Sequence, residues 1–511
     1  MRSSLLALPS RLSGWSAVWL TFSLGALSAA ALPPLHVLPV LLVSVPGLLT
    51  LIGRSDHAAM AFRRGWWFGF GLNLLGLYWV TEAILIEGER FWWLVPLAVP
   101  ALAAVMAVFI GLATMGTRLA SAGWRRILML AGCWTAMDLA RQFVLTGFPW
   151  NPLGSVWAVP GPIGDVMIQP AAWVSVHGLT LLTVLLAAAP TLGWQGWAAA
   201  GISILLWAGF GASPPSQPAQ SPGARMVVAQ GNVPQGQKWD RSLIDSTFDR
   251  YLRLTAEGIQ RAGPGTTVVL WPETASPYQL ATDAGARMAI SDVIGDAIAL
   301  IGAVRFGAEG RPRNSLFALA SGGLITQIYD KAHLVPFGEY QPDWLAIGIQ
   351  LVPGGGFMPG PGPTTLSPPG IPPVGPQICY EIIFPGQIVD EANRPAWIAN
   401  VTNDAWFGNS SGPRQHLAAA RMRAVEEGLP LVRAANTGIS AVFDGRGHEI
   451  ARLGMRETGT IVTDLPPALP PTIFARFGLA LPAVMALTAI ISAMIGANPW
   501  DRRVQRRSRN T

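Results

Sequence analysis

Long apolar segments fill the first 211 residues of the chain, and one more lies near its end. Each has roughly 17 to 25 residues, the length with which a helix crosses a bilayer. The first seven lie at 14–31, 34–53, 64–86, 92–116, 126–146, 171–192 and 195–211, and the eighth lies at 474–496. This pattern predicts a polytopic α-helical membrane protein of about eight spans, with a seven-span domain over 1–211 and a C-terminal span over 472–497.

The pattern changes after a Pro- and Ser-rich linker at 212–224. Short apolar runs such as TTVVLW, AIALIGAVRF and NSLFALAS then alternate with helix-like stretches such as SLIDSTFDRYLRLTAEGIQRA and HLAAARMRAVEEG. Alternating strands and helices are typical of an α/β domain with buried sheets. We therefore expect a separate α/β domain over 225–468.

Composition and charge support the membrane assignment and orient it. Hydrophobic residues make up 51% of the chain and charged residues only 13%, against about 25% charge in soluble proteins. Arginines gather in alternate loops and in the tail, at Arg54, Arg63, Arg64, Arg118, Arg125, Arg126, Arg502, Arg503, Arg506, Arg507 and Arg509. The positive-inside rule places both termini in the cytoplasm, including the basic tail at 498–511, and the α/β domain on the outer side. The arginines form no patch with interleaved aromatic residues, so no nucleic-acid partner is expected.

Three reactive side chains each follow an apolar run of the α/β domain. Glu273 ends TTVVLWPE, Lys331 follows LITQIYD, and Cys379 follows PVGPQI. Side chains at strand ends converge on ligands in α/β proteins. Together they form an acyl-transfer set, in which the thiol attacks a carbonyl, the carboxylate accepts the thiol proton and the ammonium group stabilises the oxyanion. Taken alone, a cysteine in an apolar run is more often a core residue, and we assign Cys133 to packing.

The flanking motifs support the catalytic interpretation. The segments WPE, DKAHLVPFGEY, ICYE and TNDAWFGNSSGPRQHLAAARMRAVEEG resemble those of the nitrilase (carbon–nitrogen hydrolase) superfamily. Their combination with membrane segments is similar to the bacterial apolipoprotein N-acyltransferase family. The resemblance implies a four-layer αββα sandwich with Glu273 as general base, Lys331 as oxyanion stabiliser and Cys379 as nucleophile.

The same resemblance suggests supporting residues. Glu339, in the GEY segment, matches a glutamate that would orient Lys331 or the base. Tyr380, Glu381 and Trp239 match functionally sensitive residues of the family and are expected to support the site or bind substrate. The cysteines form no C-x-x-C pattern and the histidines no H-E-x-x-H pattern, so neither a metal nor a cofactor is expected.

The expected reaction follows from the resemblance and from the topology. A domain outside the cytoplasm has no supply of ATP or acyl-CoA, so a membrane phospholipid is the expected acyl donor, with a Cys379 thioester as intermediate. The resemblance names the acceptor as the α-amine of the N-terminal S-diacylglyceryl-cysteine of a lipoprotein. We expect a multi-pass, monomeric protein of the bacterial inner membrane, with its catalytic domain facing the periplasm.

Two other functions compete with this prediction. The first is a membrane-tethered carbon–nitrogen hydrolase, which would use the same three residues on a small amide or nitrile with water as acceptor. The second is a transporter with an outer binding domain, which requires polar residues deep in several spans. The apolar stretches offer few of these, namely Glu82, Asp138 and Arg141, and the i,i+3 spacing of the last two predicts a local pair.

Overall fold

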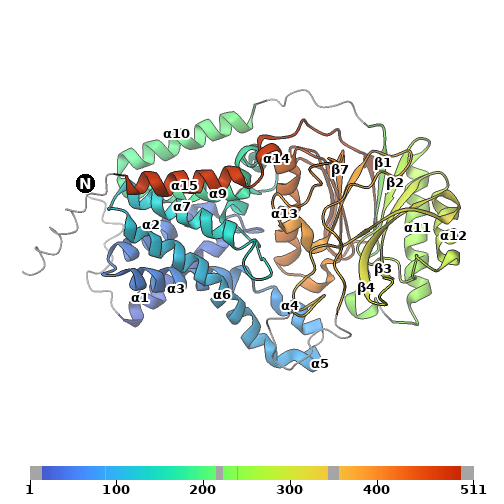
Figure 1. Cartoon of the computed structure of the whole chain (residues 1–511), viewed down its shortest axis with the longest axis horizontal. Coiled ribbons are helices and arrows are strands. Elements are labelled where there is room, and N and C mark those ends of the chain that lie inside the picture. Colours follow the sequence, from blue (N-terminus) through green and yellow to red (C-terminus); the bar gives the residue numbers. More distant parts are fainter. Residues whose placement is uncertain (1–13, 87, 214–221, 239, 343–355, 496–511) are drawn as a thin grey trace, which may run out of the picture.

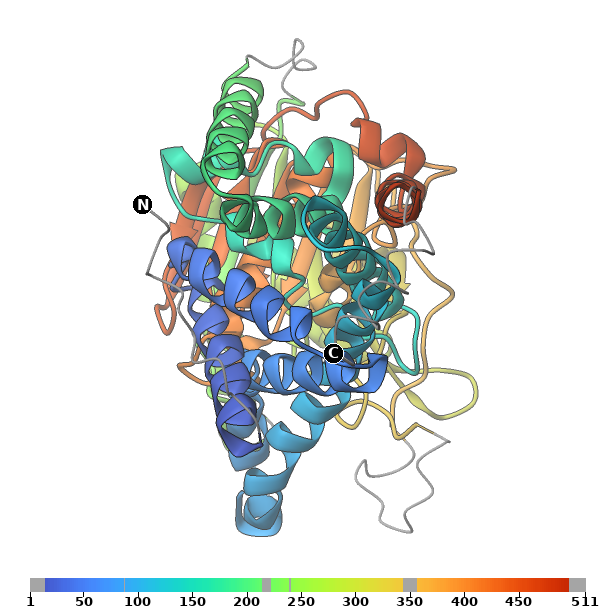
Figure 2. The same cartoon turned by 90° about the vertical axis from the view of Figure 1, so that its left-hand side faces the viewer.

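The computed structural model describes residues 14–86, 88–213, 222–238, 240–342 and 356–495 of the 511-residue chain. A bundle of helices lies at one end of the molecule and an α/β domain at the other (Figure 1). Figure 2 looks onto the bundle end, where the helices of the first 140 residues lie in front of the sheets. The bundle therefore covers one end of the α/β domain.

The bundle is built from the apolar N-terminal stretches and the C-terminal one. Its helices are α1 (Trp15–Ser28), α2 (Leu41–Gly53), α3 (Ala58–Gly76), α4 (Val80–Ile86), α5 (Gly88–Phe91), α6 (Val95–Gly116), α7 (Trp124–Ala140), α8 (Pro162–Met167), α9 (Ala171–Ala188), α10 (Trp194–Gly211), α14 (Ile473–Phe477) and α15 (Ala480–Met494). Every stretch predicted as a span thus contains a helix. Large apolar side chains on their outer faces are exposed, Trp19, Leu205 and Val484 among them, as lipid contact requires.

Fewer of these helices than predicted are long and apolar enough to cross a bilayer by themselves. Among the described residues, two helices meet that requirement, Trp92–Leu119 and Ala171–Leu192. Helices α3 and α4 would make a third span together, but they are bent by 50° at their junction. The segments Trp15–Ala31, Leu38–Gly53 and Ala480–Met494 are apolar but shorter. The number of eight spans therefore stays a prediction.

The predicted pair of charges in the fifth stretch is confirmed. Arg141 Nη2 lies 3.1 Å from Asp138 Oδ1, and both side chains are buried. Asp138 Oδ2 also accepts hydrogen bonds from Thr180 Oγ1 at 3.0 Å and from the Leu153 N–H at 3.3 Å. The pair thus joins α7 to α9 and to the turn before α8, which is a structural role within the bundle.

The α/β domain contains two sheets packed face to face. The six-stranded sheet has the order β11-β1-β2-β3-β4-β5 and the five-stranded sheet the order β10-β9-β8-β7-β6. The first consists of β1 (Arg225–Gln230), β2 (Thr267–Leu270), β3 (Ile298–Phe306), β4 (Pro312–Ala320), β5 (Leu324–Asp330) and β11 (Gly459–Asp464). The second consists of β6 (Val374–Ile378), β7 (Trp397–Thr402), β8 (Leu431–Ala435), β9 (Ser440–Phe443) and β10 (Glu449–Leu453).

Helices cover the outer face of each sheet and complete four layers. Met226 and Val228 of β1 pack between the sheets, whereas Val227 and Ala229 pack against α11 (Ile244–Ala262) and α12 (Ala284–Ile294). The second sheet packs in the same alternating way against α13 (Gly412–Glu427). Strands that are buried on both faces read as continuous apolar runs, and the predicted αββα sandwich is confirmed.

Helix α13 also docks the α/β domain onto the bundle. Its Glu426 accepts hydrogen bonds from Ser175 Oγ at 2.7 Å and from the Val176 N–H at 2.8 Å. Ser175 has a φ of 62° and breaks the helical geometry of α9 there, which leaves a backbone donor that Glu426 satisfies. Arg423 Nε lies 2.5 Å from the same carboxylate, and both side chains are buried. A buried ion pair therefore holds the kink of α9 against α13.

Replacing Glu426 by alanine should lower the free energy of unfolding by about 3–5 kcal/mol, because the Arg423 cation would stay buried without its partner. Denaturant unfolding of the detergent-solubilised protein measures this change. The matched control is Glu449→Ala, which breaks a solvent-exposed pair with Arg452 and should alter stability by about 1 kcal/mol or less. Equal losses in the two variants would contradict a docking role for Glu426.

Candidate active site

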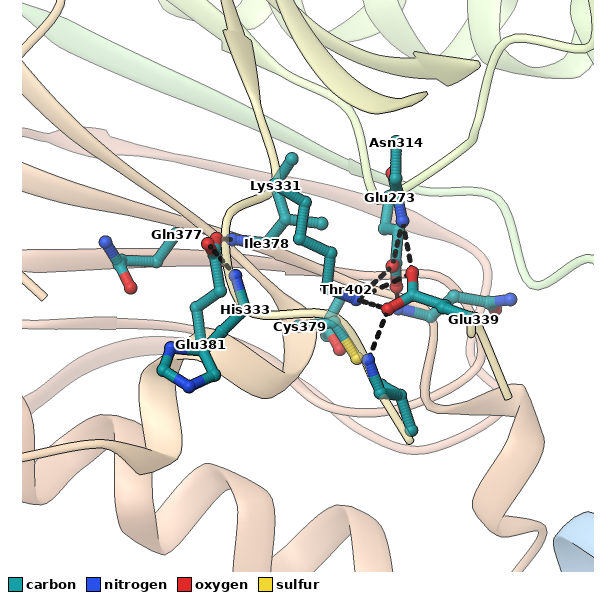
Figure 3. A network of polar contacts seen from close by, with 12 residues as sticks. Glu273, Asn314, Lys331, His333, Glu339, Gln377, Ile378, Cys379, Glu381 and Thr402 are labelled. Carbon is teal, nitrogen blue, oxygen red and sulfur yellow. Dashed lines mark hydrogen bonds and ion pairs between the residues drawn. The ribbon is translucent and has the colours of Figure 1, made fainter. Parts of the chain in front are cut away.

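Turns at the carboxyl ends of three strands bring the predicted residues together. Glu273 follows β2 after two intervening residues, Lys331 directly follows β5, and Cys379 directly follows β6. Because β2 and β5 belong to one sheet and β6 to the other, the site forms where the ends of the two sheets meet. Figure 3 shows Glu273, Lys331 and Glu339 converging, with the Cys379 sulfur beside them.

The Lys331 ammonium group lies between two carboxylates. Its Nζ is 3.3 Å from Glu273 Oε1 and 2.9 Å from Glu339. Asn314, on β4, bridges the same carboxylates, donating from Nδ2 to Glu273 Oε1 at 2.7 Å and to Glu339 Oε1 at 3.0 Å. The Asn403 N–H donates to the other oxygen of Glu273 at 2.8 Å. These bonds fix the direction of both carboxylates before any substrate binds.

The electrostatics favour a protonated thiol next to an ionised carboxylate. Burial alone would raise the pKa of Glu273, but Lys331 and the nearby Lys238 outweigh it and hold that pKa below its ordinary value. Burial opposes the charge of Lys331, yet Glu339 and Glu273 raise its pKa. Burial and the Glu273 charge raise the pKa of Cys379. The resting site therefore holds a protonated thiol and a charged carboxylate.

Cys379 sits on a sharp turn with an unusual backbone conformation. Its φ is 52°, in the left-handed region that non-glycine residues rarely adopt. Two residues later, Glu381 accepts hydrogen bonds from the N–H groups of Ile378 and Ala332, each at 2.7 Å, and from Tyr329 Oη at 2.7 Å. Glu381 thus ties the turn at Cys379 to the segment that follows Lys331.

The other predicted supporting residues differ in their placement. Tyr380 points away from the charged cluster and donates a hydrogen bond from Oη to the Gly147 carbonyl in the bundle at 2.8 Å. Its ring stacks on Phe148 of the same loop. Trp239 lies outside the described residues, so its placement stays a prediction. The sequence-predicted residues in the described part therefore form one connected site that touches the bundle through Tyr380.

Sequence reasoning missed Lys238 and Asn314. Lys238 is buried, and its Nζ donates to the main-chain oxygen of Glu273 at 3.0 Å. Burial lowers its pKa to about 8, although the charges of Glu273 and Cys379 act in the opposite direction. Lys238 and Lys331 are the only two lysines of the chain, in which arginine otherwise supplies the positive charge. This rarity was an available signal that Lys238 has a specific role. Asn314 gave no comparable signal.

The described residues contain no group of three or more His, Cys, Asp or Glu side chains arranged to hold a metal ion. The site brings together the Cys379 thiol, the Glu273 carboxylate and the buried Lys331 ammonium group. A thiol, a carboxylate and an ammonium group in this arrangement suit attack on an ester, thioester or amide carbonyl.

Comparisons with known proteins agree with both parts of the chain. The profile of the apolipoprotein N-acyltransferase N-terminal domain matches residues 24–189, and that of the carbon–nitrogen hydrolase matches residues 228–469. The chain is 38% identical to the apolipoprotein N-acyltransferase of Rhodopseudomonas palustris over 95% of its length and 96% of the relative's. It is 40% identical to that of Allorhizobium ampelinum, with 88% and 89% covered. Saccharomyces cerevisiae Nit3, of the nitrilase superfamily, aligns with 16% identity and a TM-score of 0.38 over 50% of this chain and 93% of Nit3.

Replacing Lys238 by methionine should shift the pH dependence of Cys379 alkylation. In the wild type the Glu273 carboxylate persists above its lowered pKa and is lost only as the pH falls through that value. Removing one of the two nearby cations raises this pKa, so alkylation by iodoacetamide in a Cys133→Ala background should decline at a higher pH. Lys238→Arg keeps the charge and should keep the wild-type profile. An unshifted profile in Lys238→Met would contradict the electrostatic role of Lys238.

Proposed function

The chain belongs to the apolipoprotein N-acyltransferase family, and we propose that it transfers a fatty acyl group from a phospholipid to the α-amine of the N-terminal S-diacylglyceryl-cysteine of lipoproteins. It is thus an acyltransferase of lipoprotein maturation. The observation that carries the proposed mechanism is the buried cluster in which Glu273 and Lys331 are joined at 3.3 Å beside Cys379.

The first step forms a thioester. The Cys379 sulfur attacks the ester carbonyl of the phospholipid while Glu273 takes the thiol proton. The Lys331 ammonium group donates to the oxyanion as the carbonyl oxygen gains charge. The ester C–O bond then breaks, and the departing lysophospholipid hydroxyl receives the proton from Glu273. This step leaves Cys379 acylated and the carboxylate regenerated.

The second step forms the amide. The lipoprotein α-amine, with an ordinary pKa of about 8, attacks the thioester carbonyl in its neutral form. Glu273 accepts a proton from the attacking nitrogen, and Lys331 again stabilises the oxyanion. The C–S bond breaks, and the Cys379 thiolate recovers its proton from Glu273. The products are an N-acylated lipoprotein and the free enzyme.

The other residues of the site take supporting roles in this proposal. Glu339 and Asn314 hold Lys331 and Glu273 at their positions. Glu381 fixes the turn that carries Cys379. Tyr380 joins that turn to the bundle, from which both lipid-anchored substrates would arrive. Trp239 is assigned to substrate binding through the family resemblance alone.

The proposed location is the bacterial inner membrane, with about eight spans, both termini in the cytoplasm and the catalytic domain facing the periplasm. The apolar helices support it, as does the gathering of most loop arginines in alternate loops. The donor is then a lipid of the leaflet next to the catalytic domain. A monomer contains every residue that the mechanism uses.

The orientation predicts how two single cysteines react in spheroplasts. In a Cys133→Ala, Cys379→Ala background, a membrane-impermeant maleimide should label Asp464→Cys directly, since this exposed residue of β11 lies in the catalytic domain. Ala122→Cys, in the exposed loop between α6 and α7, should be labelled only after permeabilisation. Equal labelling of the two positions in sealed spheroplasts would show that the proposed orientation is wrong.

The thioester itself is testable by intact-mass analysis. Incubation with phospholipid vesicles should add one acyl group to the wild type and to Cys133→Ala, and neutral hydroxylamine should remove it. Cys379→Ala should show no adduct and lose transfer activity by on the order of 10³-fold. If the protein instead hydrolyses a simple amide and never becomes acylated by phospholipid, the hydrolase alternative is correct and this proposal is not.

A further inference from the structure

A buried polar network lies behind Cys379, on the side of the second sheet. His416, on α13, places Nε2 at 3.0 Å from the Cys379 carbonyl oxygen and Nδ1 at 2.9 Å from Asp404 Oδ1. Arg433, on β8, donates to the other oxygen of Asp404 at 2.7 Å and lies 3.2 Å from His416 Nδ1. All three side chains are shielded from solvent. None of them belongs to the proposed reacting groups.

The left-handed backbone of Cys379 explains why its carbonyl needs such a partner. Strand β6 pairs with β7 only as far as Ile378, so the Cys379 carbonyl has left the regular ladder. A buried carbonyl without a donor destabilises the fold, and a non-glycine residue at this φ adds strain. Because a carbonyl oxygen can only accept, His416 Nε2 must carry the proton of this hydrogen bond.

Contacts from several directions hold the His416 imidazole ring in one orientation. Burial and the Arg433 charge lower the pKa of His416, which keeps the ring neutral, so with its proton on Nε2 the Nδ1 atom accepts from Arg433 Nη2 at 3.2 Å. Arg433 is in turn held by Asp404 at 2.7 Å, and Asp404 by Thr402 Oγ1 at 3.0 Å. Burial would raise the pKa of Asp404, but Arg433 and His416 lower it to about 2, so the carboxylate stays charged. The rings of Trp150 and Phe407 pack against the imidazole. Rotation of His416 away from Cys379 is thereby blocked.

We propose that His416, oriented by Asp404 and Arg433, is a positioning residue that holds the Cys379 main chain in its left-handed conformation and so aims the sulfur at the acyl carbonyl. The inference rests on the proposed role of Cys379 as nucleophile. His416 touches no reacting atom, and it acts through the backbone of the residue that does. Loss of its N–H would let the turn relax and move the sulfur relative to Glu273 and Lys331.

The test uses full-length protein in a Cys133→Ala background and vesicles of phosphatidylethanolamine and phosphatidylglycerol. In His416→Ala the rate of Cys379 acylation at saturating donor should fall by about tenfold to a hundredfold, since small misplacements of reacting atoms have effects of this size. The half-saturating donor concentration should stay unchanged. His416→Gln places an amide N–H near the position of Nε2 and should restore most of the rate, whereas the shorter His416→Asn should not.

A control separates positioning from general damage to α13. Met422 is buried on the same helix but packs in a different cluster, against the bundle. Met422→Ala should reduce thermal stability yet leave the acylation rate near that of the wild type. If His416→Gln were as slow as His416→Ala, or if Met422→Ala lost as much activity at equal thermal stability, the positioning role would be wrong.

A second readout does not depend on phospholipid as donor. Alkylation of Cys379 by iodoacetamide, followed by mass, should slow in His416→Ala and recover in His416→Gln, because Glu273 must still receive the thiol proton. Alkylation of His416→Ala at or above the wild-type rate would overturn the inference. A wild type that is alkylated but never acylated would overturn the proposed function instead, and the alkylation series would still decide the role of His416.

Discussion

The burial of the Lys331 ammonium group between two carboxylates is the interaction on which the rest of the site depends. An ammonium group withdrawn from water is destabilised by several kcal/mol, and only close, well-oriented counter-charges offset this. Glu273 and Glu339 provide them at 3.3 and 2.9 Å, and Asn314 fixes both. Because these residues come from the turn after β2, from β4 and from the segment after β5, the cluster joins three parts of the first sheet in a single arrangement.

Cys379, the proposed nucleophile, follows a strand of the opposite sheet, so the packing of the two sheets sets its distance from the charge cluster. The core between the sheets reaches Cys379 itself and includes Ile378 on β6 and Leu270 on β2. Glu273 and Cys379 are also each held by neighbours on their own side of the site. Asn314 binds Glu273, whereas Glu381 and His416 bind the main chain around Cys379. The Asn403 N–H, which follows β7 and binds Glu273 at 2.8 Å, joins the two halves directly.

Much of this arrangement could be predicted from the sequence, and the failures have physical reasons. Glu273, Lys331 and Cys379 were identifiable because each stands at the end of an apolar strand, and the i,i+3 spacing of Asp138 and Arg141 predicted their pair. Hydropathy located the helices but could not reveal the 50° bend after Gly76. The apolar character of a residue indicates what surrounds its side chain and not the direction of the helix axis. His416 and Asn314 were missed because their roles arise from contacts between distant segments that leave no local pattern, whereas Lys238 was missed although lysine is rare in this chain.

Helix α13 illustrates why polarity along a sequence can mislead. Its charged residues suggest a solvated surface, yet the helix is buried between the second sheet and the bundle. Each charge has a specific partner: Arg421 pairs with Asp165 at 2.5 Å, Glu427 with Arg394 at 2.9 Å, and Glu426 binds the kink of α9. On the opposite side, His416 reaches the Cys379 carbonyl. Because this one helix contacts both the bundle and the main chain of Cys379, it links the position of Cys379 to that of the apolar helices.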